Sequence, residues 1–360
     1  MTSQRLMEWL RDRAAGIRDR GNDHLLGEWM GLESQQVSGR VEQYFLGVDE
    51  LRRRARELGE TEFAQFVTYL VGRSQAFALD RPEASLDPLV DVMGELRRAG
   101  APRGILGTLC ELELLRAYHK IDAPGFRDSL LPGLDDLWGR LRGDVVPRLE
   151  LLDVWWRTGY WCRDDQVMVE GLRRASEEPA ALVGSWPYWE ARRLWLAGES
   201  EEAIPMLELL LHDLRKGQRP DALWRLYVEV ELGLQEATLG RNEAAGGRWT
   251  RVVGESKVHP DPMLHWNLAR FGAAYHRALG DGAGELAAWR RGLEVIEQLG
   301  LNRLRCEFAL SLAEAGREAG DEEAVAEGRA VLEEVLPGLR SQAELEPRRR
   351  ALGDGGGAAG

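Results

Sequence analysis

One stretch decides the fold of this chain: Ala191-Arg-Arg-Leu-Trp-Leu-Ala-Gly-Glu-Ser-Glu-Glu-Ala-Ile204. Apolar residues recur at helical spacing on both sides of its glycine, which predicts one helix over residues 186–197 and a second over 200–216. Gly198 suits the left-handed backbone that ends a helix, and Ser200 before two glutamates suits the start of the next. The stretch therefore predicts two helices joined by a tight turn.

The same punctuation recurs at a nearly fixed spacing. Pairs of glycine and a charged residue begin 42, 40 and 40 residues apart, at Gly198, Gly240, Gly280 and Gly320. Helix-ending glycines and prolines, 36 to 43 residues apart, alternate with these pairs and extend upstream at Gly59, Gly100, Gly143, Pro179, Gly217, Pro260 and Gly300. Such a period is typical of a solenoid, in which each unit buries its apolar face against its neighbours. We therefore expect an all-α solenoid of about seven antiparallel helical hairpins over residues 59–340, with almost no β-sheet.

The two ends of the chain lack this period. Residues 1–58 predict two or three helices, with breaks near 21–23 and 38–39, and we interpret them as an N-terminal helical cap. Residues 341–360 combine consecutive arginines with a run of glycines, so we expect a disordered tail there. The expected organisation is thus a cap, a repeat domain over 59–340 and a tail.

Composition narrows the classes of function. Asp and Glu number 60 against 47 Lys and Arg, a formal charge of −13, so the chain should repel a nucleic-acid backbone. The sequence has neither the apolar segment of a signal peptide nor that of a transmembrane helix, and its three cysteines lack the spacing of metal or redox sites. We therefore expect a cytoplasmic protein with free thiols, no membrane partner and no direct contact with nucleic acid.

The sequence also lacks the common catalytic and cofactor motifs. The phosphate-binding loop, HExxH and GxSxG are missing, and no glycine-rich dinucleotide motif opens a strand–helix unit. His259 and His265 are six residues apart, which does not suit two metal ligands on one helix. We expect neither an enzyme nor a bound cofactor or metal. The alternative is an enzyme with a pocket in the tryptophan-rich middle of the chain, where Asp153, Arg157 and Tyr160 are the candidate residues.

The repeat unit resembles a tetratricopeptide repeat. Ala191, Gly198 and Ala203 stand where that family places the small residues that let two helices approach closely. Later units keep parts of the pattern at Gly233, Gly240, Ala245, Trp249, Ala273, Gly280, Trp289 and 320–324. The period is longer than the roughly 34 residues usual in the family. The resemblance implies a right-handed superhelix whose first helices line a concave groove, and a protein that binds peptides, protein segments or small signals and rarely catalyses.

The family's spacing also implies which side chains face the groove. Counted back from the turn between paired helices, five positions fall in the second to fourth hairpins and two in the sixth: Tyr118, Arg157, Tyr160, Arg192, Trp195, Asn267 and Arg270. Arginine beside an aromatic ring suits an anionic or carboxylate-bearing partner, through bidentate hydrogen bonds and stacking. Asn267 would hold a peptide backbone. The alternative is structural, with tryptophans wedged between hairpins and arginines paired with surface carboxylates.

Besides the enzyme alternative, this layout gives two hypotheses of function, both of them binding functions. The leading hypothesis is a non-enzymatic adaptor or regulator that binds a protein or peptide segment, with carboxylate or other anionic groups, in the groove. The second is a regulator that responds to a peptide or small signal in the groove and acts through its N-terminal helices. Its layout of N-terminal helices and about seven hairpins resembles that of bacterial peptide-sensing regulators. The sequence does not indicate an oligomeric state.

Overall fold

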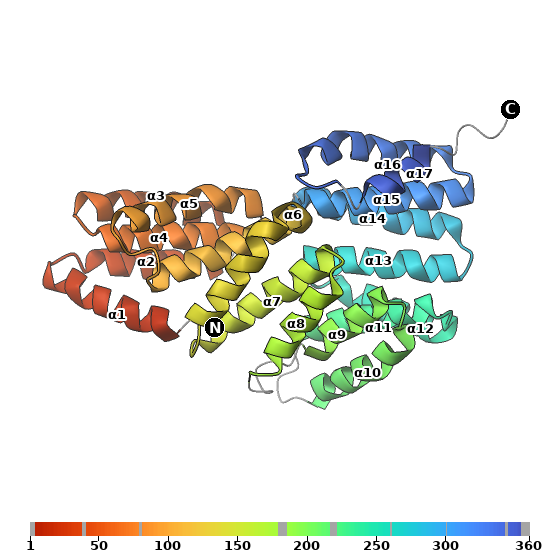
Figure 1. Ribbon diagram of the computed structural model, residues 1–360, viewed down its shortest axis with the longest axis horizontal. Helices are drawn as coiled ribbons and strands as arrows, with labels where there is room; N and C mark the ends of the chain where they lie inside the picture. Colours follow the sequence, from red (N-terminus) through yellow and green to blue (C-terminus); the bar gives the residue numbers. More distant parts are fainter. Residues whose placement is uncertain are drawn as a thin grey trace. The chain divides into compact units, whose positions relative to one another are not determined.

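The chain is helical throughout the part that the structure describes (Figure 1). The computed structural model describes residues 4–37, 41–78, 81–178, 186–216, 222–259, 261–299, 301–342 and 345–353, and these ranges contain no strand. Helices pack mainly against helices that are close in sequence, as in an α-solenoid, so the all-α prediction is confirmed. The contacts divide the chain into two compact units, residues 1–158 (unit 1) and 159–360 (unit 2).

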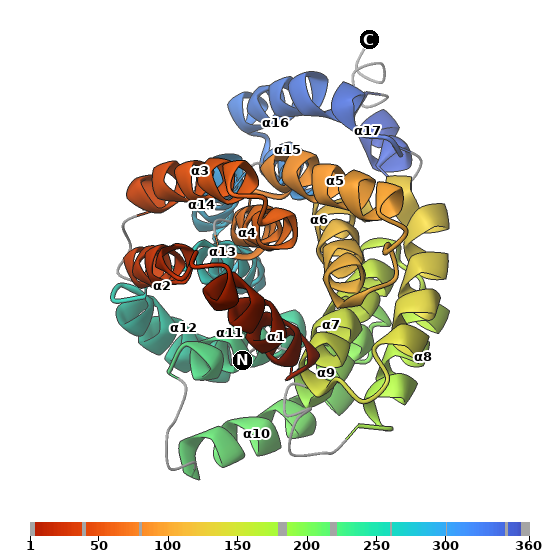
Figure 2. The same cartoon turned by 90° about the vertical axis from the view of Figure 1, so that its left-hand side faces the viewer.

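Unit 1 contains the first six helices and most of the seventh. Their bounds are α1 (Gln4–Asp19), α2 (His24–Val37), α3 (Val41–Glu57), α4 (Thr61–Arg73), α5 (Pro82–Arg98), α6 (Ile105–Arg140) and α7 (Val145–Trp161). Helix α4 packs against both α3 and α5 (Figure 2) and continues into a π-helical turn, Ser74–Ala78. Helix α6 is kinked at Asp122, whose φ of −163° and ψ of 78° are not helical, so it consists of two shorter helices.

Both ends of the chain form helices. Three helices precede residue 58, where two or three were predicted, and the first break lies at Gly21, whose φ is 77°. The second expected break, at 38–39, lies outside the described residues, and the boundary of a cap at residue 58 stays a prediction. The expected disorder is wrong for residues 345–353, because α17 (Glu346–Gly353) forms there. Leu345 and Leu352, at either end of it, are each 3% exposed and join the core, so two apolar anchors outweigh the charged composition.

Unit 2 continues with paired helices. Their bounds are α8 (Asp165–Ala175), α9 (Trp186–Leu196), α10 (Ser200–Lys216), α11 (Ala222–Thr238), α12 (Asn242–Ser256), α13 (Pro262–Ala278), α14 (Gly282–Leu299), α15 (Asn302–Ala319) and α16 (Glu322–Val335), then a 3-10 turn (Leu336–Gly338) and α17. Helices α9 and α10 match the predicted hairpin to within one residue at each end. The stretch that decided the prediction therefore folds as expected.

The glycine punctuation has the predicted backbone conformation. The four glycines inside hairpins, Gly198, Gly240, Gly280 and Gly320, have φ values of 80°, 69°, 71° and 71°, and the three upstream, Gly59, Gly100 and Gly143, have 76°, 73° and 85°. This left-handed region strongly favours glycine over residues with a Cβ. The other punctuating residues, Pro179, Gly217, Pro260 and Gly300, lie outside the described residues.

Small residues bring neighbouring helices close together. Ala203 and Ala245 are fully buried, and a Cβ added at Gly233 would come within 2.3 Å of the Phe271 ring. Helix α11 can therefore pack directly on α13. None of the three cysteines, all of which lie in the described ranges, forms a disulfide. No helix in the described ranges combines the length and the apolar character that a membrane crossing requires.

Candidate functional site

Unit 2 contains a cavity of about 200 Å³ that we call the arginine–tryptophan cavity. Its wall is built by the end of α7 and by α9, α13, α14, α15 and α17, elements that are far apart in the sequence. The lining residues are Tyr160, Trp161, Arg163, Trp195, Trp266, Arg270, Trp289, Leu304, Glu307, Phe308, Ser311 and Arg348. Four tryptophans and three arginines thus converge on one small space.

The apolar wall is held in place by edge-on ring contacts. Phe308 lies 5.1 Å from Trp289 and 6.2 Å from Trp266, centroid to centroid, with both pairs nearly perpendicular. The indole N–H of Trp266 donates to the sulfur of Met263 (3.1 Å), and that of Trp289 donates to Glu285 (3.3 Å). Because these N–H groups already have partners, Trp266 and Trp289 offer the cavity their apolar rings.

Arg270 stacks against this wall. Its guanidinium carbon lies 4.8 Å from the ring centroid of Trp195 and 5.8 Å from that of Trp266. Among the described residues, no carboxylate lies within ion-pair distance of Arg270. A guanidinium held by ring faces keeps the N–H donors of its edge available, and these donors match a planar or tetrahedral anion.

Arg163 reaches the rim of the cavity from an unusual turn. Its φ of 52° makes it the one non-glycine residue with a left-handed backbone in the described part of the chain. Its N–H bonds to the Tyr160 carbonyl and the next N–H to that of Gly159, the pattern in which Gly198 closes the α9–α10 turn. Arg163 thus occupies a place that glycine fills in the later hairpins. Its guanidinium lies 5.8 Å from the Tyr160 ring and, within the described ranges, forms no ion pair.

The other charged residues of the lining are paired. Arg348, from α17, binds Glu314 at 2.5 and 2.8 Å and donates to the hydroxyl of Ser311 at 3.3 Å. Glu307 lies 3.8 Å from the Nε of Arg303. The three arginines and one glutamate of the lining therefore leave a net charge of two positive units, carried by Arg163 and Arg270.

The positive charge around the cavity affects the ionisation of Tyr160. Arg192, which is 6% exposed, packs against Tyr160. Its guanidinium carbon lies 4.8 Å from the ring centroid, and it donates a hydrogen bond of 3.4 Å to the phenol oxygen. Burial raises the pKa of the Tyr160 phenol, but the guanidiniums of Arg270, Arg192 and Arg163 outweigh it and lower that pKa below its ordinary value. The cavity wall therefore stabilises negative charge.

The structure brings together four of the seven residues that the sequence places in the groove. Tyr160, Trp195 and Arg270 line the cavity, and Arg192 lies directly behind Tyr160. Asn267 is 5% exposed, and its amide donates to the Met263 carbonyl of its own helix (2.7 Å) rather than facing the cavity. Two others belong to unit 1, where Tyr118 stacks on Phe126 at 4.6 Å and Arg157 pairs with Asp153 at 2.9 Å.

Sequence reasoning missed several residues of the lining. Trp289 lies on α14, the second helix of its hairpin, and Arg348 lies in the segment expected to be disordered. Only Arg163 carries a signal that the sequence could have yielded, because it stands where the later hairpins have glycine. The others meet at the cavity through long-range packing.

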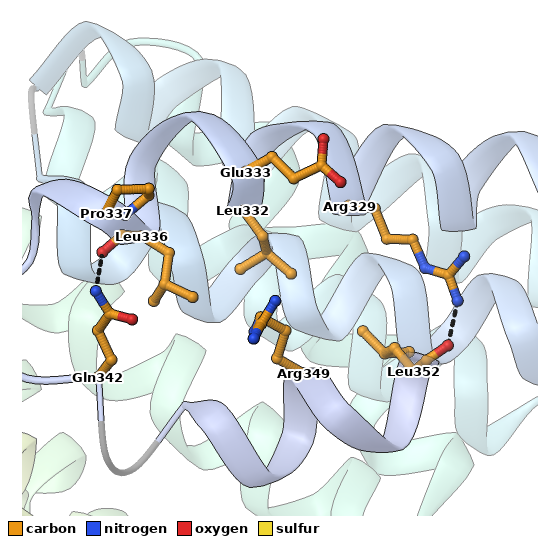
Figure 3. A pocket seen from close by; sticks show the side chains of 8 residues that line it. All are labelled: Arg329, Leu332, Glu333, Leu336, Pro337, Gln342, Arg349 and Leu352. Atoms are coloured by element: carbon orange, nitrogen blue, oxygen red, sulfur yellow. Dashed lines mark hydrogen bonds between the residues drawn. The ribbon is translucent and has the colours of Figure 1, made fainter. Parts of the chain in front are cut away.

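A second cavity, of about 560 Å³, lies between α16 and α17 (Figure 3). Arg329 donates to the carbonyl of Leu352, Gln342 donates to that of Leu336 at 3.0 Å, and Arg349 binds Glu346 of its own helix. Of these contacts, the one from Arg329 attaches α17 to α16, so part of the polar lining of this cleft holds the last helix in place. No known family model and no curated protein sequence matches this chain.

Proposed function

We propose that this protein is a non-enzymatic binding module, an adaptor or regulator, whose unit 2 binds an anionic group of a protein or peptide segment. The arginine–tryptophan cavity is the centre of that site. The observation that carries the proposal is the pair Arg163 and Arg270, which face the cavity beside aromatic rings and without a carboxylate partner among the described residues. In an acidic protein of net charge −13, a local excess of positive charge selects an anionic group.

The lining supports binding rather than catalysis. Seven of its twelve residues are arginine or tryptophan, and guanidiniums and indole rings bind and orient a group but neither give nor accept a proton at neutral pH. In the candidate set of the enzyme alternative, the carboxylate of Asp153 is paired with the guanidinium of Arg157 at 2.9 Å, and neither residue lines the cavity.

The proposal includes a tetratricopeptide-like architecture, with about seven hairpins in a right-handed superhelix and the N-terminal helices as a cap. What supports it is the pairing of α9 with α10 and of α13 with α14 around glycines of left-handed backbone. Buried alanines at 203 and 245 add the small residues that such helix pairs need.

Selection from a random peptide library tests the proposal. The native protein and an Arg163→Gln/Arg270→Gln variant would each be immobilised, and selected peptides would be synthesised and titrated against both. Arg290→Gln is the matched control, because Arg290 lies in unit 2 but pairs with Glu327 and does not line the cavity. We expect peptides rich in Asp or Glu that bind the native and control proteins and lose at least about tenfold in affinity for the variant. Selected peptides without acidic groups, or equal affinity for all three proteins, would overturn the proposal.

A further inference from the structure

We propose that the anionic group is a doubly charged phosphoryl group on a single aromatic ring, presented by the bound segment. This inference rests on the proposed function, because it specifies the group that the same cavity accepts. It is carried by three features of the cavity: its net charge, its size and aromatic wall, and the backbone conformation of Arg163.

The net charge of the lining matches a dianion. Arg348 is compensated by Glu314, and Glu307 lies beside Arg303, so these residues add no excess charge. Arg163 and Arg270 remain, and a group with a single negative charge would leave one of them uncompensated. A phosphate monoester carries close to two negative charges at neutral pH and three acceptor oxygens, which suit two guanidiniums.

The size and wall of the cavity match one ring. A volume of about 200 Å³ is below the roughly 300–1,000 Å³ of pockets that enclose whole drug-sized ligands, so a side-chain-sized group fits better than an intact nucleotide. The rings of Trp266, Trp289 and Phe308 already meet edge to face, the geometry in which a further ring would join them.

Aromatic residues of this kind also form cages for quaternary ammonium groups, which ring faces attract. Here the chain supplies its own cation, because Arg270 lies against Trp195 and Trp266. A second cation would be repelled by Arg270, whereas an anion would be attracted by it. The cage chemistry therefore favours an anion.

Arg163 places a charged side chain in the lining at a turn where glycine would be more stable, which favours a role for that charge in binding. A left-handed backbone disfavours side chains with a Cβ, and the later hairpins have glycine at this place. Such outliers are typical of functional positions. The substitution Arg163→Gly therefore removes one charge while keeping the backbone that the turn requires.

Calorimetric titration with four small probes tests the inference. Phenyl phosphate, benzenesulfonate and phenyltrimethylammonium share one ring and carry two negative, one negative and one positive charge, and inorganic phosphate lacks the ring. We expect phenyl phosphate to bind the native protein at least about tenfold more tightly than each of the others. In Arg163→Gly this preference over benzenesulfonate should fall to about threefold or less, and Arg290→Gln should retain it.

The outcomes separate the two proposals. Equal affinity for phenyl phosphate and benzenesulfonate would overturn the dianion and leave the proposed anion-binding function standing. Equal affinity for phenyl phosphate and inorganic phosphate would overturn the aromatic ring. Failure of both ring-bearing anions to bind would overturn this inference alone, because the acidic peptides of the preceding test decide the proposed function. Tighter binding of phenyltrimethylammonium than of either anion would overturn both.

Discussion

In unit 1, Arg73 and Arg116 bind two carboxylates, whereas Arg163 and Arg270, at the cavity of unit 2, lie against aromatic rings and form no ion pair with any described residue. Glu113, which is fully buried, lies 2.5 Å from Arg73 and 2.7 Å from Arg116. Glu150 lies 2.8 and 3.4 Å from the same two arginines. The charges of this cluster therefore cancel within unit 1, and those of the cavity do not.

The difference separates structural arginines from binding arginines. A carboxylate takes the N–H donors of a guanidinium, so a paired arginine has little left for a ligand. An aromatic ring takes the face of the guanidinium and leaves the donors at its edge. Burial alone does not distinguish the two roles; the chemistry of the neighbours does.

The largest expected loss of stability comes from a substitution in the arginine–glutamate cluster of unit 1. Arg116→Ala leaves Glu113 buried with half of its partners, and losing one member of a buried ion pair costs about 3–5 kcal/mol of the free energy of unfolding. Arg270→Gln, at the cavity, should cost less than about 1 kcal/mol because no buried carboxylate loses a partner. Urea unfolding followed by circular dichroism measures both. Comparable losses in the two variants would contradict the distinction.

A smaller effect is expected for the paired cluster that unit 2 also contains. Glu229 is fully buried and binds Arg215 at 3.0 Å, Arg251 at 2.9 Å and Arg225 at 3.3 Å. Glu229→Gln should cost roughly 1–3 kcal/mol, less than Arg116→Ala, because the three arginines left behind are 22–51% exposed and water can solvate them. The same unfolding measurement gives the order of the two losses. A larger loss for Glu229→Gln would show that exposure of the remaining partners does not limit the damage.

The sequence predicts the hairpins far better than the cavity, for a physical reason. A turn is encoded locally, so Gly198 and Gly240 reveal it from their own positions and the periodic residues around them. Counting along the repeat also finds Tyr160 and Arg270, because both lie on the first helix of a hairpin. Arg348 and Trp289 reach the cavity through packing between distant segments, which periodicity does not encode.

The substitution Arg163→Gly should raise stability while it weakens binding. Glycine adopts the left-handed backbone of this turn without a steric penalty, so Arg163→Gly should raise the free energy of unfolding by about 1 kcal/mol. Arg193→Gly, inside α9, should instead lower it by about 1 kcal/mol or more, because glycine disfavours a helix interior and the ion pairs of Arg193 with Asp165 and Glu190 are lost. Thermal unfolding of the two variants measures both shifts. Destabilisation by Arg163→Gly would mean that the guanidinium holds the turn rather than a ligand.

The smallest effect is the titration of Tyr160, which reports the charge of the cavity without a ligand. Because three guanidiniums lower the pKa of Tyr160 below its ordinary value, its phenol should ionise at a lower pH than an isolated tyrosine does. A depressed folded-state pKa stabilises the fold fully only above the unfolded value, near pH 10, and that contribution is lost as the pH falls through the folded value. This contribution is absent at neutral pH, so Tyr160→Phe should not change the free energy of unfolding there through ionisation of the phenol.

Absorbance of the tyrosinate band during an alkaline titration measures this. We expect the contribution of Tyr160 to this band to be lost in Tyr160→Phe and to move to higher pH in Arg270→Gln, because Arg270 makes the largest of the three electrostatic contributions. The paired arginines supply the control, since Arg290→Gln removes a charge whose partner is Glu327 and should leave the titration unchanged. An unchanged titration in Arg270→Gln would mean that its charge is screened from the cavity, and the contrast between ring-held and carboxylate-held arginines would then have no electrostatic basis.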